Sequence, residues 1–343
     1  MAEAEAADAV AVAAGGGDVD IGSRVKLMPL LRWTLTIPLC AAAILAAGAG
    51  FAPPAVAQEQ IDISSFAATE KPPSFAEPAA AVEAFKAALT ADDPATLAKL
   101  IGLDPEKLKA DQNATSVFGE LKDLVSKGLI VQDVEDRKLL ALGAKQWPFP
   151  FPLVKGADGK WAFDTSAGLE EIVNRRVGEN ELRTIEVMRE YVDSQRAYAS
   201  EDHDGDDVLE YAQKLISSEG QTDGLYWPAD QGDGDSPAGA LVDTAALEKA
   251  KQDQGYFGYR YRILTGQGNN VAGGRYDYII NGNMIAGFAL LAWPVKYGET
   301  GVNTFAINHQ GVLYQVDLGT ETEALAKSIR RFNPGEDWSL VSD

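Results

Sequence analysis

The sequence predicts an α+β protein in which N-terminal helices and a β-hairpin are followed by a long helix packed on an antiparallel sheet. Apolar residues recur at helical spacing in two regions, 75–128 and 181–199. Two aromatic-rich runs flank a glycine turn between residues 149 and 164, and five strand-like runs separated by Gly and Asn turns fill residues 259–318. Helices and strands grouped in this way are typical of the α+β class.

Residues 1–57 are predicted to be a removable signal segment. Basic residues precede an apolar stretch over residues 33–49, and Ala55-Val56-Ala57 then presents small side chains of the kind that signal peptidase reads. Cleavage after Ala57 would give a periplasmic or secreted chain that begins at Gln58 and meets the membrane only through the segment before cleavage. An uncleaved membrane anchor is the alternative, because the apolar stretch approaches the length that spans a bilayer.

The start of the chain and its single cysteine both bear on this segment. The stretch before Met28 is acidic and rich in alanine, which is unusual for a signal, so Met28 is the more natural start. Cys40 lies within the apolar stretch, so a processed chain would hold no thiol and no disulfide. Lipid attachment at Cys40 is an alternative, although Ile37-Pro38-Leu39 lacks the small residues that such processing normally requires.

The charge of the chain argues against one class of partner. There are 51 acidic and 30 basic residues, for a formal net charge of -21. Such a charge opposes binding to nucleic acid or to an anionic membrane surface, and no run of basic residues interleaved with aromatics creates a local exception. The acidity suits solubility and cation binding instead.

Residues 58–74 are polar and aperiodic, which predicts a flexible leader. Residues 75–180 are expected to form a small α+β domain with three amphipathic helices, the first near Pro78, the second near Pro94 and the third over 115–128. Their apolar stripes contain Ala81, Val82, Phe85, Leu89, Leu97, Leu100, Ile101, Val117, Leu121, Leu124 and Val125.

A hairpin should complete this first domain. Its two runs, 149–154 and 161–164, are separated by a turn that contains Gly156 and Gly159, and their prolines favour an edge position. Trp147 and Trp161 are expected to pack in the hairpin core, with stacking on a sugar as the alternative.

Residues 181–343 are expected to form a second domain, which opens with a helix from Glu181. One stripe of that helix is predicted to face the sheet residues Phe288, Leu290 and Phe305. The stripe contains Leu182, Ile185, Met188, Val192 and Ala199. Further elements are expected as a helix over 241–250, strands over 259–264, 276–280, 285–293, 303–308 and 312–318, and a last helix over 321–330.

A set of motifs occurs in a fixed order along the chain, at 147–155, 161–165, 174–182, 191–199, 209–213, 223–228, 288–294 and 297–302. Their order resembles that of a bacterial family of exported proteins known as domain of unknown function 2950. The resemblance spans Phe75 to the C-terminus and implies export, but it implies no activity.

A second, weaker similarity is to the soluble part of type IV pilins and pseudopilins. It rests on residues 198–199, 258–261, 292–294, 298–301 and 305–311. This pilin-like similarity implies a helix lying on an antiparallel sheet, although here a predicted domain precedes the helix.

One acidic loop is a candidate metal site. Asp202, Asp204 and Asp206 alternate at a spacing that lets a tight loop direct several oxygens at one hard cation, and Glu210 follows. Calcium is the expected ion, although no cofactor is required by any motif. The alternative is a solvated acidic loop in which Asp207 caps the next helix.

The remaining motifs give no catalytic centre. His203 and His309 are the only histidines, no Gly-x-Ser-x-Gly elbow occurs, and the Gly-rich segments lack the residues of a phosphate cradle. Arg175 and Arg176 are expected to pair with carboxylates rather than to capture a ligand anion. The sequence therefore predicts a non-enzymatic binding or structural module of the cell envelope, with an unknown partner or ligand. The alternative is an envelope glycan hydrolase that uses paired carboxylates and tryptophans. Its candidate tryptophans are Trp147, Trp161, Trp227 and Trp293.

Overall fold

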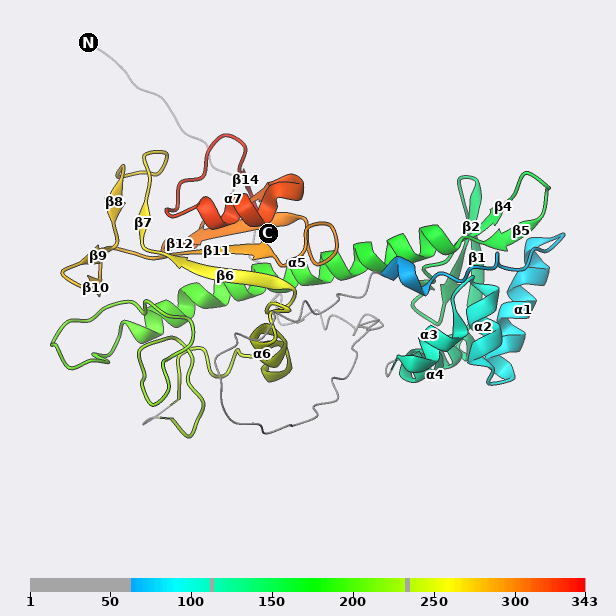
Figure 1. Cartoon of the computed structure of the whole chain (residues 1–343), viewed down its shortest axis with the longest axis horizontal. Helices are drawn as coiled ribbons and strands as arrows, with labels where there is room; N and C mark the ends of the chain where they lie inside the picture. The colour runs from blue at the N-terminus through cyan, green and yellow to red at the C-terminus, as the bar shows by residue number, and fades with distance from the viewer. Residues whose placement is uncertain (1–62, 112–113, 232–234, 343) are drawn as a thin grey trace, which may run out of the picture.

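The computed structural model describes residues 63–111, 114–231 and 235–342. The predicted signal segment and its cleavage site lie outside these residues. Within them, no helix is both long enough and apolar enough to cross a membrane. Two hydrophobic clusters form, one near each end of a single long helix, α5 (Figure 1).

The N-terminal cluster is built on four short helices. They are α1 (Pro78–Thr90), α2 (Pro94–Leu100), α3 (Pro105–Ala110) and α4 (Ala114–Ser126). Asp93 and Asp104 cap α2 and α3 by accepting backbone N–H bonds, and a proline occupies the first turn of each, where no N–H is needed. The three predicted helices are confirmed, with Phe85 and Leu121 buried as expected. Helix α3 was not predicted.

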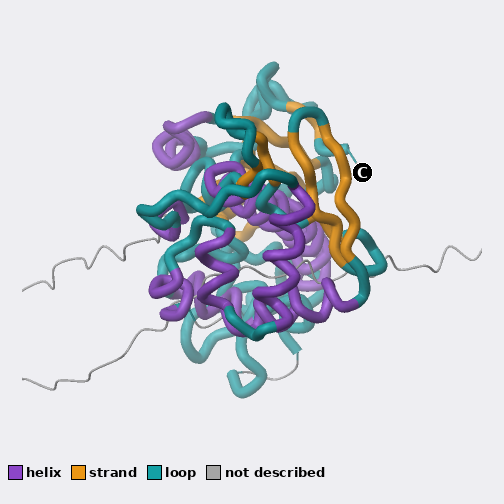
Figure 2. The backbone as a smooth tube through the Cα atoms, turned by 90° about the vertical axis from the view of Figure 1, so that its right-hand side faces the viewer, coloured by secondary structure: helices purple, strands orange, loops and turns teal. Residues whose placement is uncertain are grey.

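An antiparallel sheet closes this cluster in the order β1-β2-β4-β5, with β3 paired to β2. The strands are β1 (Leu129–Val134), β2 (Arg137–Leu142), β3 (Trp147–Pro148), β4 (Leu153–Lys155) and β5 (Trp161–Phe163). The predicted hairpin is confirmed as β4 and β5, whereas β1 was not predicted. Figure 2, which looks at this end of the molecule, shows the helices grouped to one side of the strands.

Residues 63–74 are not the flexible leader that was expected. The short 3-10 helix η1 (Ile63–Phe66) buries Phe66 in the N-terminal cluster. Phe75 and Trp161 exchange two backbone hydrogen bonds, each of 2.7 Å. Paired backbone and a buried aromatic ring therefore hold this segment on the cluster.

Helix α5 (Thr165–Tyr198) is 34 residues long, so it begins well before the predicted start at Glu181. The carboxylate of Asp164 caps it by accepting the N–H of Ala167 at 3.0 Å. The prediction was wrong because an apolar stripe reports burial against a core rather than helicity, and the middle of α5 makes its contacts through polar side chains instead. At 1.5 Å per residue the helix extends for about 50 Å.

The helix is tied to the second half of the molecule by polar side chains near its middle. Glu181 Oε1 accepts the N–H groups of Val302 and Asn303, each at 2.8 Å, and Asn180 donates to the carbonyl of Thr300 at 2.8 Å. Two motifs far apart in the sequence, 174–182 and 297–302, therefore meet in space.

Leu182, one residue of the apolar stripe predicted for this helix, does not face the sheet as predicted. Leu182 is 61% exposed, whereas Met188 and Val192 are buried. Leu182 precedes the buried Thr184 by two residues, which is about 200° around a helix. Leu182 therefore faces solvent, and Tyr191, whose ring meets that of Phe288 edge-on at 5.5 Å, makes the sheet contact instead.

The C-terminal cluster contains a five-stranded antiparallel sheet in the order β14-β13-β12-β11-β6. Its strands are β6 (Tyr259–Leu264), β11 (Ala289–Pro294), β12 (Asn303–Asn308), β13 (Leu313–Asp317) and β14 (Ser339–Leu340). Two-stranded pairs extend from it: β7 (Gly266–Gln267) with β8 (Tyr276–Asp277), and β9 (Ile279–Ile280) with β10 (Asn283–Met284). Helices α6 (Thr244–Lys251) and α7 (Thr322–Ser328), with η2 (Gly319–Glu321), complete it. The α+β class is confirmed, while the pilin-like detail stays a prediction.

Strand β11 is buried along its whole length because helices cover both faces of the sheet. Ala292 pairs with Tyr261, whose hydroxyl donates to Thr184 of α5 at 3.2 Å. The next residue, Trp293, points to the other face, where its ring nitrogen donates to Glu323 of α7 at 2.7 Å. The sheet therefore separates an α5 side from an α7 side.

Candidate functional site

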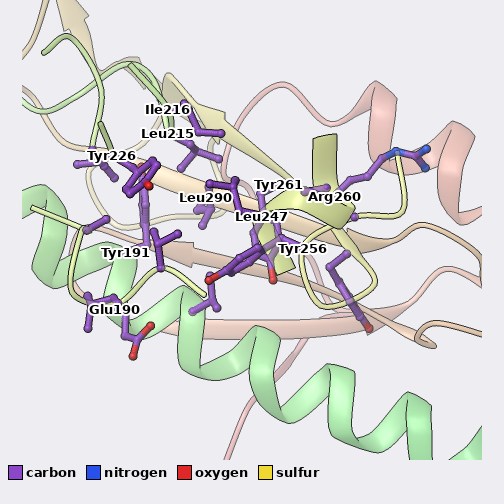
Figure 3. Close-up of a pocket in the computed structure, with 18 of the residues that line it drawn as sticks. Glu190, Tyr191, Leu215, Ile216, Tyr226, Leu247, Tyr256, Arg260, Tyr261 and Leu290 are labelled. Atoms are coloured by element: carbon purple, nitrogen blue, oxygen red, sulfur yellow. The ribbon is translucent and has the colours of Figure 1, made fainter. Parts of the chain in front are cut away.

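A cavity of about 390 Å³ opens on the α5 side of the C-terminal sheet (Figure 3). Its walls come from α5, α6, strands β6 and β11, and the irregular segments 215–226 and 238–242. Most of the lining is aliphatic or aromatic, with Leu215 and Ile216 on one side and Glu190 of α5 on the other. An apolar cavity of this size with few polar groups has the form of a small-molecule site.

The irregular wall is held by one buried side chain of α5. The side-chain amide of Gln195 accepts the N–H of Ala212 at 2.8 Å and donates to the carbonyl of the same residue at 2.8 Å. It therefore pairs both backbone groups of Ala212, as a neighbouring strand would in a sheet. The same amide donates to the hydroxyl of Tyr191 at 3.0 Å. The chain from Ala212 onward is thereby fixed at the cavity without regular secondary structure.

Most polar groups around the cavity are already paired. The Tyr256 hydroxyl accepts the N–H of Asp243 at 2.9 Å. Arg260 forms ion pairs with Asp253 at 2.9 Å and with Glu323 at 3.5 Å. These contacts shape the wall and pair the charge of Arg260, while the Tyr256 hydroxyl keeps its own O–H as a donor.

Among the charged side chains that line the cavity, Glu190 is the exception. It has no hydrogen bond or ion pair within the described residues, and it is only partly exposed. Burial raises the pKa of the Glu190 carboxyl, and the nearby Glu186 raises it further, while Arg183 opposes the shift. The cavity thus offers one carboxyl group to a ligand that carries an N–H, an O–H or a positive charge.

The predicted acidic loop brings three carboxylates together. Asp202, Asp204 and Asp206 each place an oxygen within 4.8 Å of the others, and all three are exposed. Asp202 accepts the N–H groups of Gly205 at 2.8 Å and of Asp207 at 2.9 Å, and these bonds lower its pKa. The loop is therefore held partly by its own backbone.

The fourth predicted ligand lies apart from this group. Glu210 accepts the N–H of Met284 at 2.9 Å, and Asp206 accepts a hydrogen bond from Asn283 at 2.7 Å, so both carboxylates reach the β10 strand. No helix starts at Asp207, and none forms in the described residues between it and α6, so the alternative role of a helix cap is wrong. Binding of a cation at the loop stays a prediction.

Arg175 and Arg176, which are adjacent in α5, take different partners. Arg175 pairs with Glu171 at 2.7 Å and lies 5.0 Å from the ring centre of Trp147, so its predicted pairing with a carboxylate is confirmed. Arg176 donates instead to the backbone carbonyl of Glu299 at 3.0 Å.

The tryptophans and histidines form no common site in the described residues. Trp227 and Trp293 are buried, and Trp161 packs against the N-terminal cluster. His203 stacks on Tyr198 with ring centres 3.9 Å apart. These rings contribute to packing.

The fold and the cavity define a two-cluster α+β protein with one apolar, carboxyl-bearing pocket on its C-terminal sheet. The chain belongs to the family described as "Protein of unknown function (DUF2950)", whose model matches residues 73–341. The match confirms the resemblance seen in the motifs. No curated protein and no solved structure matches the chain.

Proposed function

We propose that this protein is an exported, non-enzymatic binding module that takes an apolar ligand in the cavity between α5 and α6. The observation that carries the proposal is the lining itself: about 390 Å³ bordered mainly by aliphatic and aromatic side chains, with Glu190 as the one charged side chain of the lining that has no ion pair in the described residues. A ligand with an apolar body and one amine or hydroxyl fits this distribution. Export rests on the signal segment predicted over residues 1–57.

A glycan hydrolase is the weaker candidate for the same cavity. Glu190 and Asp253 both border it, but Asp253 is held by Arg260 at 2.9 Å. Trp293 is buried and bonded to Glu323, so it presents no face for sugar stacking. Sugars also need many hydrogen-bond partners, which a largely aliphatic wall does not supply.

Titration with N-phenyl-1-naphthylamine, an apolar fluorescent probe with one N–H, tests the binding site. We expect one saturable site in the unaltered chain. Ala250 borders the cavity, so Ala250→Trp should fill it and weaken probe binding by about tenfold or more. Ala245 is exposed on the same helix and away from the cavity, so Ala245→Trp is the matched control and should bind as the unaltered chain does. Equal weakening by both substitutions would argue against this site.

N-terminal sequencing of the exported form tests the compartment separately. The expected first residue is Gln58. A chain that keeps residues 33–49 would favour the membrane anchor, and a chain that stays in the cytoplasm would contradict export.

A further inference from the structure

A second cavity, of about 470 Å³, lies on the α7 side of the C-terminal sheet. Leu264 and Ala306 border it, and they share a face because they pair with Ala289 and Leu291 of β11. The first cavity contacts Leu290, which points to the opposite face, and it also contacts Arg260 and Trp293. The two cavities share no lining residue, so they are separate.

Three arginines border this second cavity: Arg275, Arg330 and Arg331. Such a group is unexpected in a chain with 51 acidic and only 30 basic residues. Arg331 forms an ion pair with Asp277. Within the part of the chain that the structure describes, the guanidinium groups of Arg275 and Arg330 have no hydrogen bond and no ion pair. Two positive charges at the cavity are therefore left without a carboxylate.

The wall that carries Arg331 is fixed in place. Its guanidinium donates to the carbonyl of Tyr276 at 3.0 Å, and a Cβ at Gly266 would lie only 2.4 Å from Nη1, so the glycine of β7 makes room for it. The side chain of Asn333, which also borders the cavity, accepts the N–H of Asn270 at 2.9 Å. These contacts fix Arg331 and Asn333 at the cavity, whereas Arg275 and Arg330 are exposed at its border.

A fourth arginine lies behind the wall. Arg262 donates to the carbonyl of Ala326 at 2.7 Å and to that of Ile329, so it closes the C-terminal end of α7. Burial lowers the pKa of Arg262, and the nearby positive charge of Arg330 lowers it further. Arg262 and Arg330 therefore repel one another, and an anion bound beside Arg330 would reduce that repulsion.

We propose that this cavity binds the phosphate group of an organic phosphate monoester. Two guanidinium groups without carboxylates match its two negative charges, and their planar N–H forks suit phosphate oxygens. Trp338 and Pro334 border the same cavity and provide an apolar wall for the carbon part of the ligand. The adjacent carboxylates Glu336 and Asp337 do not border it.

Calorimetric titration of the purified full chain with phenyl phosphate tests this site. We expect one saturable site, weakened by about tenfold or more when Arg275→Gln and Arg330→Gln are combined, because the charge-assisted bonds to the phosphate are lost. The matched control combines Arg137→Gln and Arg196→Gln, which removes the same charge from exposed side chains elsewhere. The control should bind as the unaltered chain does. No saturable binding, or equal weakening by both pairs, would overturn the proposal.

Two further readouts place the binding in this cavity and on the phosphate group. Trp338→Phe should remove most of the change in tryptophan fluorescence on binding while the heat of binding remains, since Trp338 borders the cavity. Ala250→Trp should leave phenyl phosphate binding unchanged, because the two cavities share no lining residue. Phenol, which lacks the phosphate, should not compete; competition by phenol equal to that of phenyl phosphate would overturn the proposal.

The phosphate could belong to a soluble molecule or to a lipid headgroup, and two arms distinguish these sources. One arm uses inorganic phosphate, and the other uses phosphatidylcholine vesicles with and without phosphatidic acid. Inorganic phosphate that competes with phenyl phosphate supports a soluble source. Vesicle binding that needs phosphatidic acid and is lost only in the Arg275/Arg330 pair supports a headgroup. Vesicle binding reduced equally by both arginine pairs, with no binding of phenyl phosphate, overturns the proposal.

Discussion

Glu190 borders the first cavity, and its ionisation affects the stability of the folded chain. Its pKa is raised above the ordinary value of 4.5 in the folded chain, first by burial and then by Glu186. The folded chain therefore binds the proton more tightly than the unfolded chain does, and stability falls as pH rises through the folded pKa.

Glu190→Gln should accordingly stabilise the chain at pH 7, by about 0.5 kcal/mol because the carboxyl is only partly buried. The gain should disappear below the unfolded pKa, where the native carboxyl is protonated in both states. Thermal unfolding from pH 3 to pH 8 measures this. Glu170→Gln removes the same charge from an exposed position of α5 and is the control. The same pH-dependent gain in both variants would contradict a specific effect at Glu190.

The acidic loop makes a second prediction at this scale. The carboxylate oxygens of Asp202 already accept hydrogen bonds from three backbone N–H groups. A bound ion would therefore be held mainly by Asp204 and Asp206. Calcium at a hundredfold excess over its Kd should stabilise the chain by about 2.7 kcal/mol. Combining Asp204→Asn with Asp206→Asn should abolish the rise in melting temperature.

Diffuse cation binding would also raise the melting temperature, since the net charge is -21. Magnesium at matched ionic strength controls for screening. The exposed pair Asp136→Asn with Asp193→Asn controls for the change in charge. A calcium effect that survives in the Asp204/Asp206 variant, or that magnesium reproduces in full, would leave the loop without a specific site.

At the scale of elements, the continuity of α5 through residues 174–181 is the feature most open to test. Gly178 lies in the helix with nothing within 4 Å of the position that a Cβ would take, whereas a Cβ at Gly168 would lie 2.0 Å from the ring of Phe151. Gly178→Ala should therefore stabilise the chain by about 1 kcal/mol through helix propensity. Gly168→Ala should destabilise it by about 1–3 kcal/mol through overpacking.

Chemical unfolding of the two variants measures both effects. Gly168→Ala is the matched control, because the same substitution in the same helix has the opposite sign. A Gly178→Ala variant no more stable than the unaltered chain would contradict a continuous helix at this position.

Elements with a strong local signal could be predicted from the sequence. Strands β6 and β12 begin and end where alternation and turn residues placed them, because each packs a regular apolar pattern against a helix. The start of α5 was missed because Asp164 was not recognised as a cap, although a side chain that accepts the N–H of Ala167 is a typical helix-start signal. Leu182 was misplaced because it lies at the edge of the expected stripe, and around the helix it falls on the side away from Thr184.

Neither cavity could be predicted from local patterns. The first is walled by an irregular segment whose position depends on Gln195, a polar residue that the apolar stripe does not register. The second joins Arg275 to Arg330, which lie far apart in the sequence. The adjacent pair Arg330-Arg331 in so acidic a chain was the one available signal. Tertiary contacts, rather than propensity, create both sites.

At the scale of the whole molecule, two hydrophobic clusters that share no residue are joined mainly by α5. The first cluster contains Ile172 near the start of the helix, and the second contains Met188 near its end. Residues 75–180 and 181–343 were predicted to be separate domains. Helix α5 crosses the predicted boundary and couples the clusters. Whether one cluster unfolds without the other therefore depends on the free energy of that coupling, and not on where the boundary is drawn.

We predict that each cluster can open without the other. Phe85→Ala removes a fully buried ring from the N-terminal cluster and Phe305→Ala removes one from the C-terminal cluster, each at a cost of about 3–5 kcal/mol. Hydrogen exchange followed by mass spectrometry should then show that Phe85→Ala lowers protection in α1 and β2 but not in β11 and β12. Phe305→Ala should do the reverse, because the hydrogen bonds that link the N-terminal part of α5 to the C-terminal cluster come from the helix itself, through Arg176, Asn180 and Glu181. The middle of α5 is the decisive segment. If the helix transmits the loss of either ring, both variants will lower protection equally throughout the chain, and the molecule is a single cooperative unit. If the clusters are separate, protection in α5 will fall only in the half that packs on the altered cluster.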